Sequence, residues 1–200
     1  MVKRSYSHFP DDNTEKYARH LINDAAIAIQ KADKGLVDGT DKAVTAYQKW
    51  FGATTPVLNR AAMQAKIHRM LYCINNRKVD ITYNQFCTGA LANAAASANK
   101  VAGGVPISGG DAVVAANGLT VDICPRGMRQ LTERGGNSML ITIIHEFSHS
   151  AIDTNDAVHP GTGVVCDSAA TALTLIPANA ALAVNNAESV AQFVCQAAGV

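Results

Sequence analysis

The sequence predicts an α+β fold, mainly helical with a small antiparallel sheet. The chain has 200 residues, of which 48% are hydrophobic and 16% charged, so it is long and apolar enough to bury a core. Its first and last parts carry apolar residues at helical spacing, whereas the part between them contains alternating apolar and polar residues. No internal repeat or charged linker divides the chain. We therefore expect one domain over residues 1–200, with helices at about 14–77, a sheet at about 78–124 and further helices at about 137–197.

Three helices are expected in the N-terminal part. The first covers residues 14–33, where apolar residues recur every three or four positions after an Asn13 or Thr14 cap. The second covers 41–51 and ends at a glycine, and the third runs from Pro56 to about Asn75. The apolar face of the third helix is expected to contain Val57, Ala61, Ala65, Met70 and Leu71.

The expected sheet contains a hairpin. Residues 79–83 alternate apolar and polar side chains, as a half-buried strand does. Residues 112–116 and 119–124 are joined by Asn117-Gly118, a pair that favours a tight turn because both residues accept positive φ. These patterns predict that the sheet is antiparallel at the hairpin.

Charge and hydropathy exclude two classes of partner. With 17 Lys and Arg against 16 Asp and Glu, the formal charge is +1, which offers no field for a polyphosphate, so no nucleic acid partner is expected. The most apolar runs, such as 90–96 and 178–184, are far shorter than the roughly 20 residues needed to cross a bilayer, so no membrane partner is expected. Residues 1–10 lack the apolar stretch of a Sec signal.

The strongest chemical signal is a His-Glu-x-x-His motif at 145–149, near the end of an expected helix. The apolar stripe of this helix consists of Leu140, Ile144, Phe147 and Ala151. Histidines at i and i+4 project from one face, so both rings can reach one cation at about 2.0–2.1 Å. Glu146 lies about 100° further round the helix, where it can serve as a general base. Chance gives this pattern in about 0.4% of chains of this composition. The alternative is two core histidines beside a salt-bridged Glu146.

A catalytic zinc site also needs a third protein ligand and an open fourth position. Asp153, Asp156 and His159 follow the helix. Asp153 comes too soon after His149 for the chain to reverse and better fits a turn at the helix end. Asp156 is therefore the preferred ligand, and His159 is expected near the metal. The other possibility is a Glu from a later helix, for which Glu188 is the downstream candidate.

Several short segments, taken in order from about residue 41 to 195, resemble the aspzincin metallopeptidases, the family of deuterolysin and peptidyl-Lys endopeptidase. Apart from the zinc motif, they are Tyr47-x-x-Trp50-Phe51-Gly52, Ile81-Thr-Tyr-Asn-x-x-Cys87, Ile123-Cys124-Pro125, Asp153-Thr-Asn-Asp156-Ala-Val-His159 and Asn186-Ala-Glu188-Ser189. The resemblance implies a zincin-like metallopeptidase that hydrolyses peptide bonds, with a protein or peptide as its substrate. Zincins bind substrate along a sheet edge, and a strand of the expected hairpin could be that edge.

The resemblance also implies roles for individual residues. One Zn²⁺ per chain would be held by His145, His149 and Asp156, with Glu146 as the base. His159 stands where the family has a Tyr that donates a hydrogen bond to the oxyanion, and its ring N–H is expected to fill that role.

Substrate preference is implied by Glu188, which stands where lysine-specific members of the family have an Asp. A second acid of those members is Ala191 here. The remaining carboxylate could still favour Lys or Arg after the scissile bond. The rival interpretation is a zinc-binding module of the same fold that binds peptide without hydrolysing it, with His159 marking the lost activity.

Five cysteines without a Cys-x-x-Cys spacing suggest two disulfides, although five buried reduced thiols are the alternative. Cys87 and Cys124 match positions that pair in the family, and this pair would link neighbouring strands. A second pair, Cys166 and Cys195, would connect the last two helices. Cys73 would then have no disulfide partner. The chain is expected to be a secreted or exported monomer whose signal was removed or that follows a non-Sec route. A peptidase that shows no propeptide is expected to need a cognate inhibitor or export partner.

Overall fold

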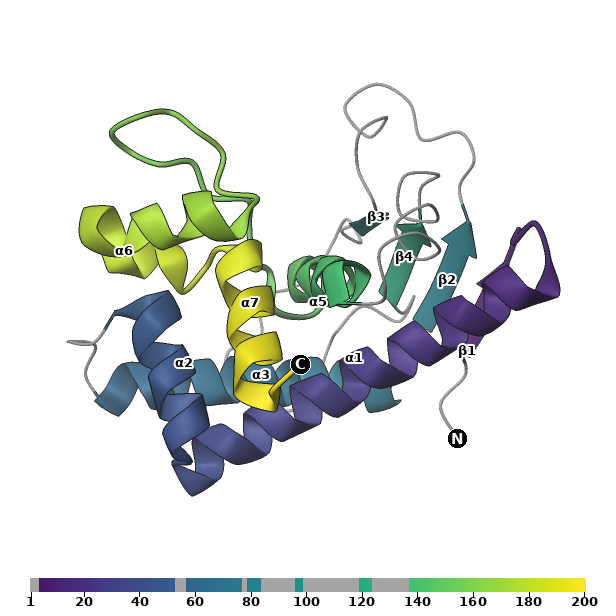
Figure 1. The fold of residues 1–200 in the computed structure, drawn as a ribbon, viewed down its shortest axis with the longest axis horizontal. Coiled ribbons are helices and arrows are strands. Elements are labelled where there is room, and N and C mark those ends of the chain that lie inside the picture. Colours follow the sequence, from purple (N-terminus) through teal and green to yellow (C-terminus); the bar gives the residue numbers. More distant parts are fainter. Residues whose placement is uncertain (1–3, 53–56, 77–78, 84–95, 99–118, 124–136) are drawn as a thin grey trace.

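The computed structural model describes residues 4–52, 57–76, 79–83, 96–98, 119–123 and 137–200 (Figure 1). In chain order the elements are β1 (Arg4–Ser7), α1 (Asp12–Asp38), α2 (Asp41–Phe51), α3 (Val57–Asn76), β2 (Val79–Tyr83), β3 (Ala96–Ala98), β4 (Leu119–Ile123), α5 (Asn137–Ile152), α6 (Ala169–Ala183) and α7 (Ala187–Ala198). Helices dominate the described chain, and the strands form one small sheet beside α5 (Figure 1). The expected mainly helical α+β fold is confirmed.

The sheet is mixed, which corrects the expectation of an antiparallel one. Its strand order is β1-β2-β4-β3, with β1 and β4 both parallel to β2, and only β3 and β4 are antiparallel. β4 matches the second arm of the predicted hairpin, whereas the first arm at 112–116 lies outside the described residues. Because β4 has β2 on one side and β3 on the other, it is not a sheet edge, so it cannot be the edge strand that was expected to bind substrate. The described edges are β1 and β3.

The N-terminal helices begin and end largely where the sequence predicts. α1 begins two residues earlier than expected, because Asp11 rather than Asn13 or Thr14 is its cap and accepts a hydrogen bond from the Thr14 backbone N–H. It also continues five residues beyond the expected end at 33, to Asp38, where Gly39 in the left-handed region closes it. α2 runs from Thr40 as its cap to Gly52, as predicted. On α3 the predicted face is wrong at Ala61 and Ala65, which are exposed, but it is confirmed at Met70, which is buried, and at Leu71, which packs partly buried against the core. The side chain of Val57 lies outside the described residues. The buried residues of α3 are Met63, Ile67, Met70, Cys73 and Ile74.

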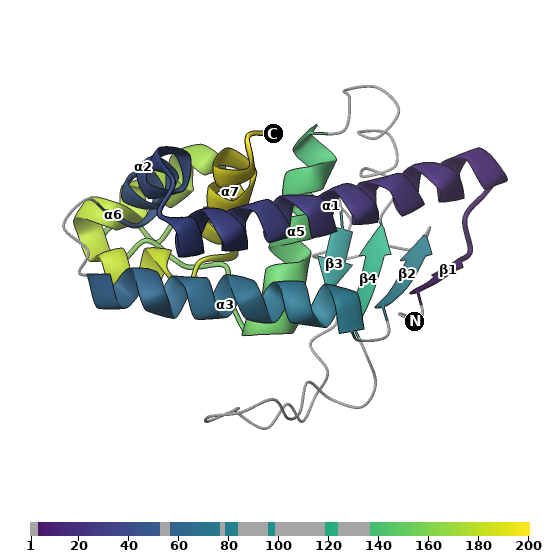
Figure 2. The same cartoon turned by 90° about the horizontal axis from the view of Figure 1, so that it is seen from below.

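Helix α5 is central to the fold. It contacts β3 and β4 on one side and α7 on the other, and α1 and α3 run past it (Figure 2). The predicted stripe of Leu140, Ile144, Phe147 and Ala151 is buried. Burial of this stripe fixes the rotation of α5 about its axis and hence the direction of its polar residues. In the part of the chain that the structure describes, no helix is long and apolar enough to span a membrane.

The predicted disulfide between Cys166 and Cys195 is absent, because both are buried thiols. Cys166 precedes α6 and its thiol donates to the Val164 carbonyl oxygen at 3.7 Å. Cys195 lies on the buried face of α7, where burial and the charge of Glu188 raise its pKa to about 12. Proximity to the ends of two helices does not determine where each sulfur points. Cys87 and Cys124 lie outside the described residues, so that pair stays a prediction.

Candidate metal centre

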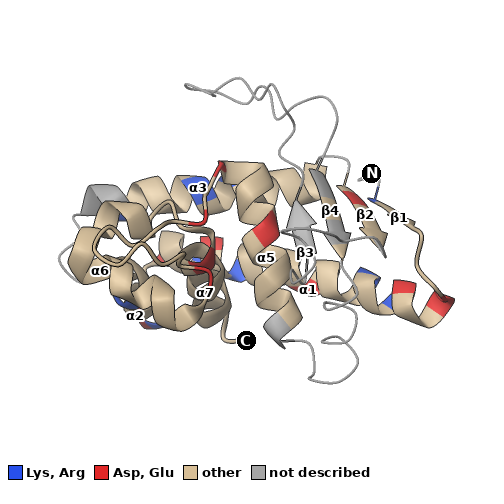
Figure 3. Cartoon of the chain, turned by 90° about the horizontal axis from the view of Figure 1, so that it is seen from above, with Lys and Arg blue, Asp and Glu red and all other residues tan. Residues whose placement is uncertain are grey.

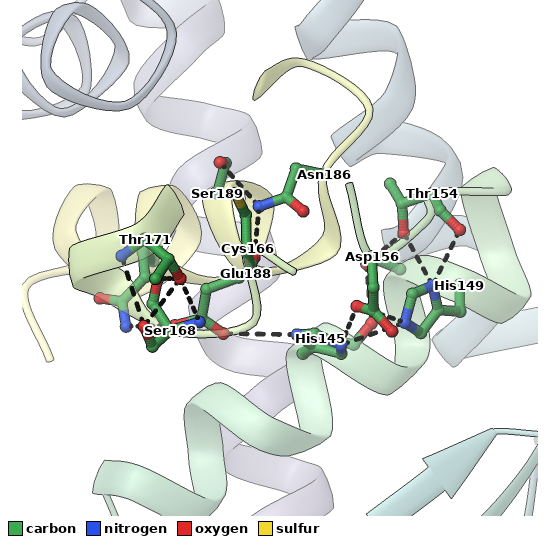
Figure 4. Close-up of polar contacts among 12 residues, drawn as sticks. His145, His149, Thr154, Asp156, Cys166, Ser168, Thr171, Asn186, Glu188 and Ser189 are labelled. Atoms are coloured by element: carbon green, nitrogen blue, oxygen red, sulfur yellow. Dashed lines mark hydrogen bonds and ion pairs between the residues drawn. The ribbon is translucent and has the colours of Figure 1, made fainter. Parts of the chain in front are cut away.

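Three side chains converge at the C-terminal end of α5. The histidines His145 and His149 project from adjacent turns, and Asp156 reaches them from the segment after the helix (Figure 4). The two Nε2 atoms are 3.0 Å apart, and the Oδ1 atom of Asp156 lies 3.0 Å from Nε2 of His145 and 3.4 Å from Nε2 of His149. The two rings meet at 80° with their centroids 4.8 Å apart. Three potential ligand atoms therefore form a compact triangle.

The distances between these three atoms are those expected for ligands of a tetrahedrally coordinated zinc ion. Ligands bound at about 2.0–2.1 Å in a tetrahedron lie about 3.3 Å from one another. The observed separations of 3.0, 3.0 and 3.4 Å are close to that value. Two imidazole nitrogens and one carboxylate oxygen are also ordinary zinc donors, and three protein ligands leave a fourth position for solvent or substrate. The described residues thus fit a catalytic zinc site.

The outer nitrogen of each histidine is held by a hydrogen-bond acceptor. Nδ1 of His149 donates to the Thr154 carbonyl oxygen at 2.8 Å. The Thr154 hydroxyl is in turn hydrogen bonded to Ser148 at 2.6 Å, and the Ser148 hydroxyl donates to the His145 carbonyl oxygen at 2.7 Å. Because a carbonyl can only accept, the proton of neutral His149 lies on Nδ1, and its Nε2 lone pair faces the centre of the triangle.

Glu188 occupies the corresponding place behind His145. Its Oε2 atom lies 3.3 Å from Nδ1 of His145, and its Oε1 atom accepts a hydrogen bond of 2.8 Å from the Gln192 amide (Figure 4). Nδ1 and Nε2 are on opposite sides of an imidazole ring, so Glu188 is not placed to be the third ligand. Its side chain is only 8% exposed, and both its oxygens have partners, which does not fit the predicted role as a pocket for a substrate ammonium.

The segment that carries Asp156 is held by the turn before α7. Asn186 is fully buried, and its Oδ1 atom accepts from the Ala157 backbone N–H at 2.9 Å. The backbone of Asn155 pairs with the same turn, donating to the Asn185 carbonyl and accepting from the Ala187 N–H. Asp153 has φ of 57°, which agrees with its expected place in a left-handed turn at the end of α5. These bonds bring Asp156 back toward the helix it follows.

The electrostatics of the cluster favour a cation. Burial alone would lower the pKa of His145, but its hydrogen bonds with Asp156 and Glu188 and the charge of Glu146 raise it to about 10. Hydrogen bonds from the two histidines lower the pKa of Asp156 despite its partial burial. Residues 137–200 contain five Asp and Glu and no Lys or Arg. Accordingly, α5, α6 and α7 carry no blue segment in Figure 3, and no described basic side chain from these helices competes for the site.

His159, the predicted oxyanion donor, lies in the turn after Asp156. Its Nδ1 atom accepts from the backbone N–H groups of Gly161 at 3.1 Å and Thr162 at 3.2 Å. Because both bonds use the lone pair of Nδ1, the ring proton belongs on Nε2, and Nε2–H is left as a donor.

Most buried polar residues of the described chain surround this cluster. They are Ser148, Thr154, Asn186, Glu188 and Ser189, and the remaining one is Asp33. The sequence patterns did not indicate the roles of Ser148, Thr154 and Asn186. A signal for the last two was present, because both stand inside segments that resemble the family motifs, but only the contacts assign them a function. Buried polar groups require partners, so this concentration makes the region the candidate functional site.

The chain shares its fold with a solved structure and carries a His-His-Asp cluster. Among solved structures the chain is similar to a zinc peptidase from Grifola frondosa, with a TM-score of 0.61 over 92% of this chain and 95% of that chain. The two sequences are 18% identical, so the similarity establishes the fold alone. The resemblance read from the sequence is confirmed at that level. No protein-family model and no curated protein sequence matches the chain.

Proposed function

We propose that the protein is a zinc-dependent metalloendopeptidase that hydrolyses peptide bonds in proteins. The observation that carries the proposal is the triangle of His145, His149 and Asp156, whose ligand atoms have the spacing of a tetrahedral site with one open corner. Glu146 stands next to the first histidine on α5, which is the place for a base that works beside the ion. The shared fold of a zinc peptidase supports the same conclusion.

The residues of this chain divide the chemistry between them. A bound zinc ion would supply a Lewis acid that activates water and polarises the scissile carbonyl. Glu146 takes the proton from the attacking water and returns it to the leaving amine. Nε2–H of His159, which the turn leaves as a donor, stabilises the oxyanion. A binding protein has no need of a carboxylate in the position of Glu146, which favours hydrolysis over a non-hydrolytic zinc module.

A preference for a basic residue after the scissile bond would rest on the overall charge of this region, not on a pocket built by Glu188. The five carboxylates without a basic residue in 137–200 attract a cationic peptide at a distance. Glu188 itself is buried behind His145, and Ala191 is fully buried. We therefore propose a mild preference for basic peptides in place of strict lysine specificity.

Zinc content and casein hydrolysis of the wild type and Glu146→Gln test this function. Glu146→Gln is expected to keep one zinc per chain and lose at least about 100-fold in kcat, because the general base is gone. Glu15→Gln, at a partly exposed position in the first turn of α1, is the matched control and should keep both properties. If the wild type binds zinc and cleaves no unfolded protein, the non-hydrolytic module is the correct interpretation.

A further inference from the structure

We propose that Glu188 is a positioning residue that orients His145 for zinc, and that it does not contact the substrate. The inference rests on the proposed zinc site and assigns to this glutamate a different task from the one its place in the sequence suggested. Glu188 lies in the first turn of α7, and Oε2 is 3.3 Å from Nδ1 of His145 (Figure 4).

The contact with Glu188 selects the tautomer of His145 that can bind a metal through Nε2. A carboxylate next to Nδ1 holds the ring proton there, so the lone pair is on Nε2. Nε2 is the atom that faces Asp156 at 3.0 Å and His149 at 3.0 Å. The His145 ring has the Glu188 carboxylate on one side and the atoms of the metal triangle on the other. These contacts hold the ring in the orientation in which Nε2 can bind zinc. His149 has its own equivalent, the Thr154 carbonyl at 2.8 Å.

Glu188 is itself held firmly. Its second oxygen accepts from the Gln192 amide, one helical turn further along α7, at 2.8 Å. The helix is packed against α1, α2 and α5, so its first turn is not free to move relative to His145. A carboxylate with 8% of its side chain exposed is costly to bury unless its oxygens are paired, and here both are. Such a rigid, paired acid suits a supporting role better than the capture of a mobile substrate.

A substrate pocket formed by Glu188 would require one of its carboxylate oxygens to face an open space. Both oxygens already have partners, and the neighbouring position that would supply a second acid is the buried Ala191. Glu188 therefore acts on substrate only through His145. The expected consequence of its removal is weaker zinc binding, with no change in which bonds are cleaved.

The test measures the zinc dissociation constant of Glu188→Ala, Glu188→Gln and Gln192→Ala by competition with a chromophoric chelator. Removal of a carboxylate that orients a ligating histidine weakens metal binding by about 10- to 100-fold, and this is expected for Glu188→Ala. Glu188→Gln keeps the volume and one acceptor oxygen, so its loss should be smaller. Gln192→Ala, which leaves the carboxylate but frees it to move, should fall between Glu188→Gln and the wild type. Glu15→Ala, at a partly exposed position in the first turn of α1, is the control.

Two further readouts separate positioning from other roles. The visible absorption of the Co²⁺-substituted protein should shift in Glu188→Ala, because the orientation of a ligand changes. The zinc-saturated Glu188→Ala enzyme should keep its cleavage-site profile on a peptide library.

The inference is overturned if zinc affinity is unchanged and the preference for basic residues disappears, which indicates a substrate pocket. It is also overturned if zinc cannot be loaded at saturation, which indicates a ligand. If Glu188→Ala does not fold, unchanged affinity in Glu188→Gln and Gln192→Ala overturns it. Failure of the wild type to bind zinc instead refutes the proposed function.

Discussion

Substitution of Asn186 by Ala tests how the segment that carries Asp156 is held. The Asn186 side chain is fully buried and makes three hydrogen bonds. Its oxygen accepts from the Ala157 N–H at 2.9 Å, and its amide nitrogen donates to the Cys166 carbonyl at 3.0 Å and to the Ser189 hydroxyl at 3.1 Å. The substitution removes all three bonds and leaves their partners in place.

The expected cost follows from those partners. A buried polar group that loses its partner costs about 1–3 kcal/mol, and the Cys166 carbonyl and the Ala157 N–H both lose theirs. The Ser189 hydroxyl can rotate to another acceptor and adds less. Water that enters the space left by the side chain offsets part of the loss. We expect Asn186→Ala to lower the free energy of unfolding by about 2–4 kcal/mol. The neighbouring Asn185 is exposed, so Asn185→Ala should change it by less than about 0.5 kcal/mol.

Urea unfolding of metal-free protein, followed by circular dichroism in the presence of a chelator, measures both variants. A lower midpoint for Asn186→Ala with an unchanged m-value is the expected result. Zinc affinity should fall in the same variant, because Asp156 is next to Ala157 in the released segment. An Asn186→Ala midpoint equal to that of Asn185→Ala would refute the reasoning that these bonds hold the segment.

Three further predictions concern the centre itself. Asp156→Asn is expected to weaken zinc binding strongly, since a charged ligand is lost, and equal zinc content after dialysis would contradict this. His159→Asn keeps a turn acceptor but has no Nε2–H, so kcat should fall about 10²- to 10³-fold with little change in KM; an unchanged kcat removes His159 from the mechanism. In metal-free protein the raised pKa of His145, about 10, means that its stabilising contribution is present below pH 6.5 and is lost as the pH rises through 10. The lowered pKa of Asp156 makes its contribution disappear as the pH falls below 3.8. Because His145 loses its proton over the higher range, the urea midpoint of the metal-free protein should be lower at pH 9 than at pH 6. A higher midpoint at pH 9 would contradict the raised pKa of His145.

The parts that the sequence predicted well depend on residues close to one another along the chain. The limits of α2 follow from a cap at one end and a glycine at the other, and the zinc motif on α5 requires only a spacing of four residues on a helix. The place of Asp156 beside the two histidines was also expected, because only a few acidic residues after α5 are close enough to reach back. Each of these inferences needed only residues that are neighbours along the chain.

The parts that were missed depend on partners far away in the chain. The parallel pairing of β1 with β2 joins Arg4 to Val79, and no local pattern announces it. On α3 the alanines gave a helical spacing, but larger side chains such as Met63 and Ile67 gain more from burial and turn toward the core. Glu188 reads as an acidic residue in a helix, and only its contact with His145 distinguishes support from substrate binding.

Anomalous diffraction at the zinc edge, from crystals grown with zinc, tests the central claim most directly. We expect a single peak about 2.0–2.2 Å from Nε2 of His145, Nε2 of His149 and the Asp156 carboxylate, with solvent in the fourth position. A peak bound by Glu188, a fourth protein ligand that closes the site, or no peak at this cluster would contradict the account.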